Sequence, residues 1–260
     1  MPAINYVSTP VMIFLTAWMA GDIPRRRMKL IREVAEREAR RSRLSRYFSP
    51  GVAEVIEQSY DPGDGEKSEI SVLFADIRGF TKMSEKLDAA HVVEILNEFH
   101  AHMVEVVFDE AGTLDKYLGD GLMAYFNAPV KQPDHAVRAV RCALAMETAL
   151  QAWNQSKGLA VGQQLQVGIG IHCGLAIVGA IGAPHRREFT AIGDTVNVAS
   201  RIENHTKTID GSILVSEALM RLAADDPNLA FDKIEEVVIR GRDEKVRVYQ
   251  PMLKSVDRAT

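Results

Sequence analysis

The chain has 260 residues, of which 47% are hydrophobic and 25% are charged, so it is long enough for one sizeable core and has an ordinary globular composition. Its formal net charge of -4 carries no basic excess, and we expect no nucleic-acid partner. Cys142 and Cys173 are too few for a disulfide framework or a cysteine metal site, and we expect both to be buried, reduced thiols in a cytosolic compartment.

The N-terminal segment from residue 4 to residue 20 contains no charged side chain and is followed by Pro24 and three arginines at 25–27. It is slightly shorter than the roughly 20 residues that span a bilayer. A secretory signal fits poorly, because the basic cluster follows the apolar stretch instead of preceding it. We predict a membrane helix with its basic flank on the cytoplasmic side. The alternative is an apolar packing segment followed by a solvated basic helix.

Basic charge is concentrated between residues 25 and 46, where ten Arg or Lys stand against three Glu; this local +7 leaves about -11 (-4 minus 7) elsewhere. The helix-forming residues 28–47 lack a sustained heptad, and we expect a connecting helix that could pair with its copy in a dimer. The predicted parts of the chain are an apolar, possible membrane segment at 1–23, a basic connecting helix and linker at 24–66, a compact domain at 67–252 and a tail at 253–260.

Helices and strands alternate in the compact domain. Residues 70–77 form an apolar run of buried-strand length, and residues 91–112 carry apolar side chains at helical spacing and stop at Gly112. This alternation indicates an α/β or α+β fold in which helices cover a mixed sheet. The further predicted elements are a hairpin at 116–126, a helix at 133–155, a strand at 164–182, a helix at 193–206 capped by Asp194 or Thr195, a strand and helix at 211–223 and a hairpin at 231–250.

Asp76 lies at the end of the strand at 70–77, just before a turn with Gly79 and Thr81 that leads into a helix. A carboxylate at the exit of a buried strand can hold a metal ion, while free backbone N–H groups of the turn meet phosphate oxygens. An ordinary helix-capping aspartate is the alternative.

Asp120 lies at the tip of the hairpin KYLGDGLMAYF, residues 116–126. Turn chemistry alone could explain it, because Asp and Gly tolerate the positive φ of two-residue hairpin loops. If the two strands are neighbours, Asp76 and Asp120 emerge at one end of the sheet and could share a pair of divalent ions, as when an oxygen nucleophile displaces pyrophosphate. Two carboxylates beside a phosphate-binding turn imply a nucleotide.

Four separated blocks, FADIRGFT, DKYLGDGLMAYF, GIGIHCGLAIVGAIG and FTAIGDTVNVASRIE, together resemble the class III adenylate/guanylate cyclase catalytic domain over about residues 68–250. The resemblance implies a ferredoxin-like α+β fold with a mixed, mainly antiparallel sheet covered by helices. It also implies two Mg²⁺ or Mn²⁺ ions in each active site. The residues it implies are Asp76, Asp120 and the Ile77 carbonyl as metal ligands, with Gly79, Phe80 and Thr81 at the substrate phosphates.

Lys116 and Thr190 align with the residues that read the base in this family. An ammonium donates to N1 of adenine and a hydroxyl can accept from its exocyclic amine, whereas guanine offers these groups in the opposite order. The pair therefore favours ATP over GTP. Guanylate cyclases of the class usually carry Glu and Cys at these positions, and many adenylate cyclases carry Asp in place of Thr190.

Asn197 and Arg201 are four residues apart and would share one helix face. The resemblance implies that Asn197 positions the ribose and that Arg201 stabilises the charge growing on the α-phosphate. Where the family usually has a Lys for the terminal phosphates, this chain offers Arg240 or Arg242, and Arg242 matches better by spacing.

The resemblance implies an adenylate cyclase that makes 3′,5′-cyclic AMP and pyrophosphate from ATP in signal transduction, with the proton acceptor open between Asp76 and water. In the family, metal-binding and base-reading residues reach each site from opposite subunits, so we expect a homodimer with two active sites at its interface. We expect a cytoplasmic catalytic domain tethered to the inner (plasma) membrane.

Two alternatives stay open, a guanylate cyclase and a catalytically silent nucleotide-binding signalling module. Loss of a metal-binding Asp, of Asn197 or of Arg201 would favour the silent module, and none is lost. A diguanylate cyclase is disfavoured because no GGDEF-like hairpin is present; the hairpin tip reads LGDGL.

Overall fold

A computed structural model of the chain describes residues 65–160, 163–183, 185–209, 211–238 and 245–254, with scattered residues between 28 and 57. The chain divides into two compact units, Met1–Tyr47 and Phe48–Thr260. In the first unit the described residues between 28 and 39 are helical. The predicted membrane segment at 4–20 lies outside the described residues, and within them no helix has both the length and the apolar character to cross a bilayer.

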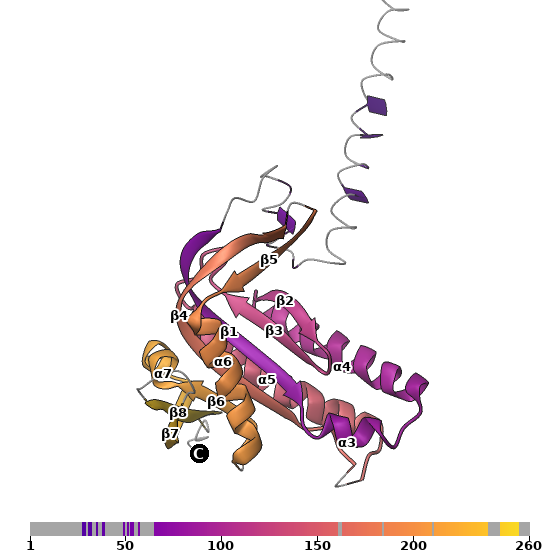
Figure 1. The fold of residues 1–260 in the computed structure, drawn as a ribbon, viewed down its shortest axis with the longest axis vertical. Coiled ribbons are helices and arrows are strands. Elements are labelled where there is room, and N and C mark those ends of the chain that lie inside the picture. The colour runs from indigo at the N-terminus through magenta and orange to yellow at the C-terminus, as the bar shows by residue number, and fades with distance from the viewer. Residues whose placement is uncertain are drawn as a thin grey trace, which may run out of the picture. The chain divides into compact units, whose positions relative to one another are not determined.

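In the second unit, described helical residues between 51 and 57 precede a long strand, after which helices and strands alternate (Figure 1). Its elements are β1 (Glu66–Ile77), α3 (Phe80–Ser84), α4 (Ala89–Asp109), β2 (Thr113–Leu118), β3 (Gly121–Phe126), α5 (His135–Ser156), β4 (Val167–Ala183), β5 (Arg186–Ile192), α6 (Asp194–His205), the 3₁₀ turn η1 (Thr206–Thr208), β6 (Ile213–Ser216), α7 (Glu217–Ala223), β7 (Leu229–Val238) and β8 (Lys245–Leu253).

Within the described residues the strands form one eight-stranded sheet in the order β2-β3-β1-β4-β6-β8-β7, with β5 paired to β4 outside this path. The pairing of β4 with β6 is parallel and the other pairings are antiparallel. This confirms the predicted fold class, a mixed and mainly antiparallel sheet covered by helices.

The centre of the sheet is buried on both faces, and β1 shows how the sequence achieves this. Leu73, Ala75 and Ile77 pack with α4 and α5 on one face, whereas Ile70 and Val72 join the cluster that includes α6 on the other. Successive side chains of a strand point to opposite faces, so a continuous apolar run fits a strand covered on both sides. Figure 1 shows α6 in front of the sheet and α5 behind it.

Three local expectations need correction. Strand β5 was not predicted, because its first residues Arg186, Arg187 and Glu188 are exposed and charged and show no apolar alternation. Helix α4 begins at Ala89 instead of residue 91, because the Asp88 side chain caps it. It ends at Asp109, before the predicted stop at residue 112.

The predicted caps of α6 are also wrong, since the N-cap residue is Gly193. Thr195 instead donates its hydroxyl to the Leu175 carbonyl oxygen at 2.7 Å, which ties the helix to β4. Its hydroxyl hydrogen is therefore directed at the sheet rather than serving the helix end.

Both cysteines are buried and unbonded to each other, as predicted. Burial raises the pKa of both thiols, that of Cys173 to about 12, so neither behaves as a reactive thiolate near neutral pH.

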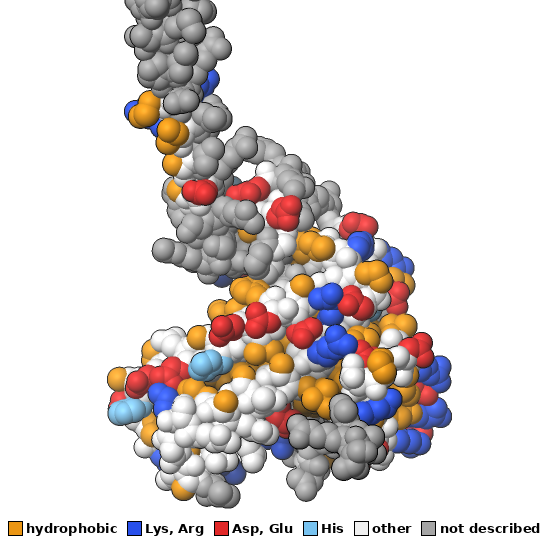
Figure 2. All heavy atoms as spheres, turned by 180° about the vertical axis from the view of Figure 1, so that it is seen from behind, with side chains coloured by type: hydrophobic (Ala, Val, Ile, Leu, Met, Phe, Trp, Pro, Cys, Tyr) orange, Lys and Arg blue, Asp and Glu red, His pale blue; other side chains and the backbone are white. Residues whose placement is uncertain are grey.

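On the face of the molecule seen in Figure 2, acidic and basic side chains are interspersed.

Candidate active site

Asp76 and Asp120 are brought together by the pairing of β1 with β3. Asp76 is the next-to-last residue of β1 and lies opposite Gly121, the first residue of β3. The Ile77 N–H donates to the Asp120 carbonyl oxygen at 3.4 Å. A Cβ atom on Gly121 would lie 2.6 Å from the Ala75 carbonyl oxygen, so glycine is what lets the hairpin approach β1 this closely.

The tight hairpin depends on Gly119, which adopts φ 68°, a left-handed conformation that glycine takes without strain. Asp120 therefore follows the glycine in the turn and supplies a carboxylate next to Asp76. Both explanations raised by the sequence therefore hold: the hairpin has the turn residues that its backbone requires, and it places the Asp120 carboxylate beside that of Asp76.

The two carboxylates repel each other. The pKa of Asp120 is raised, first by burial and then by the charge of Asp76. Glu203 adds a third acid; it is 5% exposed, and its pKa is raised to about 7, mainly by burial, with Asp76 adding to the effect.

Among the residues that the structure describes, one ammonium, that of Lys207, is paired with these acids. Its Nζ is 2.9 Å from Asp76 Oδ2 and 3.4 Å from Glu203 Oε1. One positive charge among three carboxylates leaves the cluster short of cations, which fits a site for divalent metal ions. Within the described residues no three His, Cys, Asp or Glu side chains are grouped closely enough to hold one ion.

Sequence reasoning missed Glu203 and Lys207. Their positions differ by four: Glu203 lies near the end of α6, the helix that carries Asn197 and Arg201, and Lys207 lies in η1, which follows it. This spacing was the available signal. Arg78 holds the turn that carries Lys207: its guanidinium donates to the Thr206 carbonyl oxygen at 2.8 Å and also to the Gly211 carbonyl oxygen.

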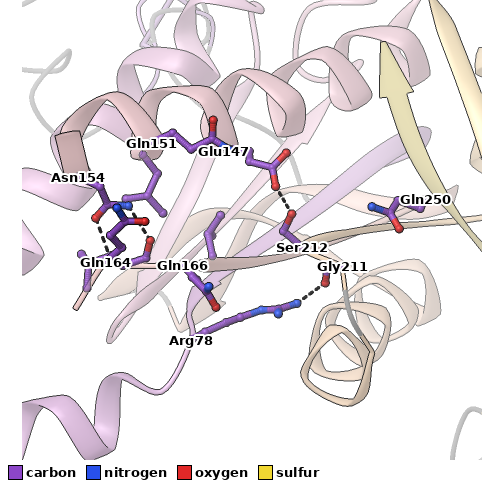
Figure 3. Close-up of a pocket in the computed structure, with 12 residues that line it drawn as sticks. Arg78, Glu147, Gln151, Asn154, Gln164, Gln166, Gly211, Ser212 and Gln250 are labelled. Carbon is purple, nitrogen blue, oxygen red and sulfur yellow. Dashed lines mark hydrogen bonds between the residues drawn. The ribbon is translucent and has the colours of Figure 1, made fainter. Parts of the chain in front are cut away.

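Arg78 also lines a polar cavity of about 390 Å³ on the α5 side of the sheet, where Figure 3 shows its guanidinium directed at Gly211. None of the predicted site residues lines this cavity. We therefore regard Arg78 as a residue that joins the end of β1 to η1, and the cavity as separate from the acid cluster.

Lys116 and Thr190 come together where β2 passes β5, through a residue that the sequence did not single out. Thr190 Oγ1 donates to Asp115 Oδ2 at 3.0 Å, and the Ala191 N–H donates to Asp115 Oδ1 at 3.2 Å. Lys116 Nζ lies 3.5 Å from Asp115 Oδ2 and 3.0 Å from Glu188 Oε2. Asp115 thus joins the two predicted base-reading residues within one subunit.

Those of the remaining predicted residues that the structure describes lie on α6 and at the start of α3. Asn197 and Arg201 lie on the exposed side of α6, as their spacing predicted, while Val198 and Ile202 on the same helix are buried. The turn residues open α3: Gly79 is its N-cap residue with φ 67°, Phe80 packs on the core and Thr81 is exposed. Arg240 and Arg242 lie outside the described residues.

Comparison of the chain with known proteins identifies its family. The family model described as the adenylate and guanylate cyclase catalytic domain matches residues 64–252. The chain is 37% identical over 184 residues to adenylate cyclase 1 of Rhizobium meliloti, covering 71% of this chain and 27% of the relative. It is 33% identical over 198 residues to an adenylate cyclase of Anabaena cylindrica, covering 74% of this chain and 38% of the relative.

Solved structures agree with the sequence relatives. The adenylyl cyclase CyaB from P. aeruginosa aligns with a TM-score of 0.66 at 31% identity, covering 73% of this chain and 96% of that one. The guanylyl cyclase Cya2 aligns with a TM-score of 0.66 at 35% identity, covering 72% of this chain and 93% of that one. The chain spans 27% and 38% of the lengths of the two curated relatives. Over residues 64–252, this chain belongs to the family of adenylate and guanylate cyclase catalytic domains.

Proposed function

We propose that this chain is an adenylate cyclase, which converts ATP into 3′,5′-cyclic AMP and pyrophosphate. The ribose 3′-oxygen bonds to the α-phosphorus, the bond from that phosphorus to the oxygen bridging the β-phosphate breaks, and the hydroxyl proton leaves to Asp76 or water. The observation that carries the proposal is the placing of Asp76 beside Asp120 at one end of a cyclase sheet.

Asp76, Asp120 and the Ile77 carbonyl would hold two Mg²⁺ or Mn²⁺ ions. When bound, such ions lower the pKa of the 3′-hydroxyl and neutralise charge on the phosphates. The excess of carboxylates over ammonium groups in the cluster supports this donor set. Lys207 offsets part of the negative charge of Asp76 and Glu203.

Lys116 and Thr190 would bind the adenine base. The names of the two curated relatives, both adenylate cyclases, support ATP as the substrate. The guanylyl cyclase Cya2, at 35% identity, makes GTP the alternative that an experiment must exclude. Asn197 would orient the ribose and Arg201 would stabilise charge on the α-phosphate in the transition state.

We propose that the active protein is a homodimer in which Asp76 and Asp120 of one subunit meet Lys116, Thr190, Asn197 and Arg201 of the other. Exposed apolar side chains near Thr190 support a subunit interface there: Leu175 and Ile177 on β4 and Ile192 on β5 are 56%, 47% and 49% exposed. Membrane attachment through residues 4–20 stays a prediction from the sequence.

The proposal is tested with the purified full chain, Mn²⁺ and either ATP or GTP, by measuring both cyclic nucleotides and pyrophosphate. We expect cyclic AMP and equimolar pyrophosphate from ATP, with little product from GTP. Cyclic GMP as the main product would identify a guanylate cyclase. A folded dimer that binds ATP and yields no cyclic product would show the silent signalling module instead.

A further inference from the structure

Asp115 is a buried carboxylate between the two residues proposed to read the base. Its side chain is fully buried, with 0% exposed, although it belongs to the β2 strand near the edge of the sheet. Three donors converge on it: the Thr190 hydroxyl, the Ala191 N–H and the Lys116 ammonium. Burial raises the pKa of the Asp115 carboxyl, and the Thr190, Lys116 and Ala191 donors act in the opposite direction because each of them stabilises the charged form. The form that can accept from all three donors at once is the carboxylate.

We propose that Asp115 fixes the Thr190 hydroxyl as a hydrogen-bond acceptor toward the base, and that this selects ATP over GTP. The inference rests on the proposed function and makes Asp115 a positioning residue. The single hydroxyl hydrogen of Thr190 is directed at Asp115 Oδ2, so the side of the oxygen that faces the substrate offers only lone pairs. These accept from the 6-amino group of adenine and repel the 6-oxo group of guanine.

The same carboxylate orients the second base-reading residue. Lys116 is held between Asp115 and Glu188, and an ammonium has three N–H donors, so these two contacts leave it able to donate to N1 of adenine. Guanine carries a hydrogen at N1 and would meet a donor there. Asp115 therefore helps to position Lys116, whose ammonium can only donate, and it sets the hydrogen-bonding sense of Thr190 alone.

Asp115→Asn tests the inference, because its outcome follows from the contacts. The Ala191 N–H requires an acceptor, so it keeps the amide oxygen on its side, and the amide nitrogen then faces Thr190. That nitrogen donates to the hydroxyl, whose own hydrogen is released toward the base. We expect the ratio of kcat/KM for ATP to that for GTP to fall by at least about tenfold.

A double-mutant cycle with Thr190→Val shows whether the effect passes through the hydroxyl. In the Thr190→Val background, Asp115→Asn should change the ATP-to-GTP ratio by less than about twofold, because no hydroxyl is left to turn. An equal shift in both backgrounds, or an unchanged ratio in folded Asp115→Asn protein, would overturn the inference. Affinities for 3′-deoxy-ATP and 3′-deoxy-GTP, which cannot cyclise, supply a binding readout independent of turnover.

If Asp115→Asn does not fold, Thr190→Asn tests the same point. Its amide nitrogen would donate to Asp115 and its amide oxygen would face the base, so a preference for ATP should persist. A preference for GTP in this variant would contradict the inference. Wild-type protein that makes no cyclic nucleotide would refute the proposed function, whereas a cyclase whose preference ignores these substitutions would refute the role of Asp115 alone.

Discussion

At the scale of single residues, Asp120 contributes repulsion to the fold while serving the proposed chemistry. Burial and the neighbouring charge of Asp76 both raise its pKa, so the ionised form is disfavoured in the folded chain when no cation is bound. Active sites typically contain ionisable groups that function requires although their charged form destabilises the fold.

We predict that Asp120→Asn abolishes cyclase activity, by at least about 100-fold, without lowering stability. In the presence of a metal chelator the variant should melt at the same temperature as the wild type or at a higher one, because a repulsive charge has been removed. Asp109→Asn, at an exposed position of α4, controls for the substitution itself. Near-normal activity of Asp120→Asn would contradict the metal-binding role.

The raised pKa of Glu203 leads to a prediction of how stability depends on pH. Its pKa is raised to about 7 from an ordinary value of 4.5, so the folded chain holds this proton more tightly than the unfolded chain does. Stability is therefore unaffected by this group below about pH 4.5, falls between about pH 4.5 and 7, and stays lower above that, by up to about 3 kcal/mol.

Melting temperatures of chelated wild type and Glu203→Gln between pH 5 and 8 measure this effect. The variant should lose much of the decline seen in the wild type and be the more stable protein at pH 8. Glu105→Gln, on the exposed side of α4, serves as the matched control. Parallel profiles for wild type and Glu203→Gln would show that Glu203 is not held protonated by the fold.

At the scale of elements, the contact of α6 with β4 decides where the proposed catalytic side chains lie. A Cβ atom on Gly170 would be 2.0 Å from the Glu203 backbone nitrogen and 2.7 Å from the Ala199 carbonyl oxygen. The helix backbone thus rests directly on the strand at this glycine, with Asn197 and Arg201 on its outer side.

We predict that Gly170→Ala destabilises the chain by about 3 kcal/mol or more, because a rigid helix backbone must move to admit the methyl group. Gly174→Ala on the same strand is the control, since its Cβ would meet a side-chain oxygen, Thr195 Oγ1, at 2.9 Å. Thermal or urea unfolding measures both. An effect of Gly174→Ala as large as that of Gly170→Ala would argue against backbone contact as the cause.

Much of the fold could be predicted because its signals are local. The alternation of Val167, Ile169 and Ile171 with glycines predicted β4, and this strand lies at the centre of the sheet. Strand β5 carried no such signal, because its charged first residues are exposed. Its formation depends on pairing with β4, which is a tertiary contact. That the glycines of β4 admit the backbone of α6 depends on packing between distant segments, which periodicity does not encode.

The arrangement of the candidate site residues could likewise be predicted only in part. Asp76 and Asp120 were recognised because a strand end and a hairpin tip are visible in sequence, and the register of β1 with β3 then places them together. Asp115 was missed because a charged residue in an edge strand reads as solvated, and only the approach of β5 buries it. Lys207 was missed because its partner Asp76 is 131 residues away in the chain.

At the scale of the whole molecule, one subunit holds two separate sets of proposed active-site residues. The acid cluster around Asp76 contacts Lys207, whereas the base-reading residues are joined through Asp115 and contact Glu188. The proposed homodimer lets the acids of one subunit meet the base-reading residues and Arg201 of the other. Activity should therefore rise more steeply than linearly with protein concentration at dilutions where the dimer dissociates.

The most direct test of an adenylate cyclase with shared sites is to co-express two inactive full-length variants, Asp120→Asn and Arg201→Ala, and measure cyclic AMP from ATP. A mixed dimer has one site with both residues intact and one with neither. Random pairing makes half of the dimers mixed, so we expect about one quarter of wild-type activity, and almost none from either variant alone. No recovery in co-purified mixed dimers, beside an active wild type, would contradict sites shared between subunits.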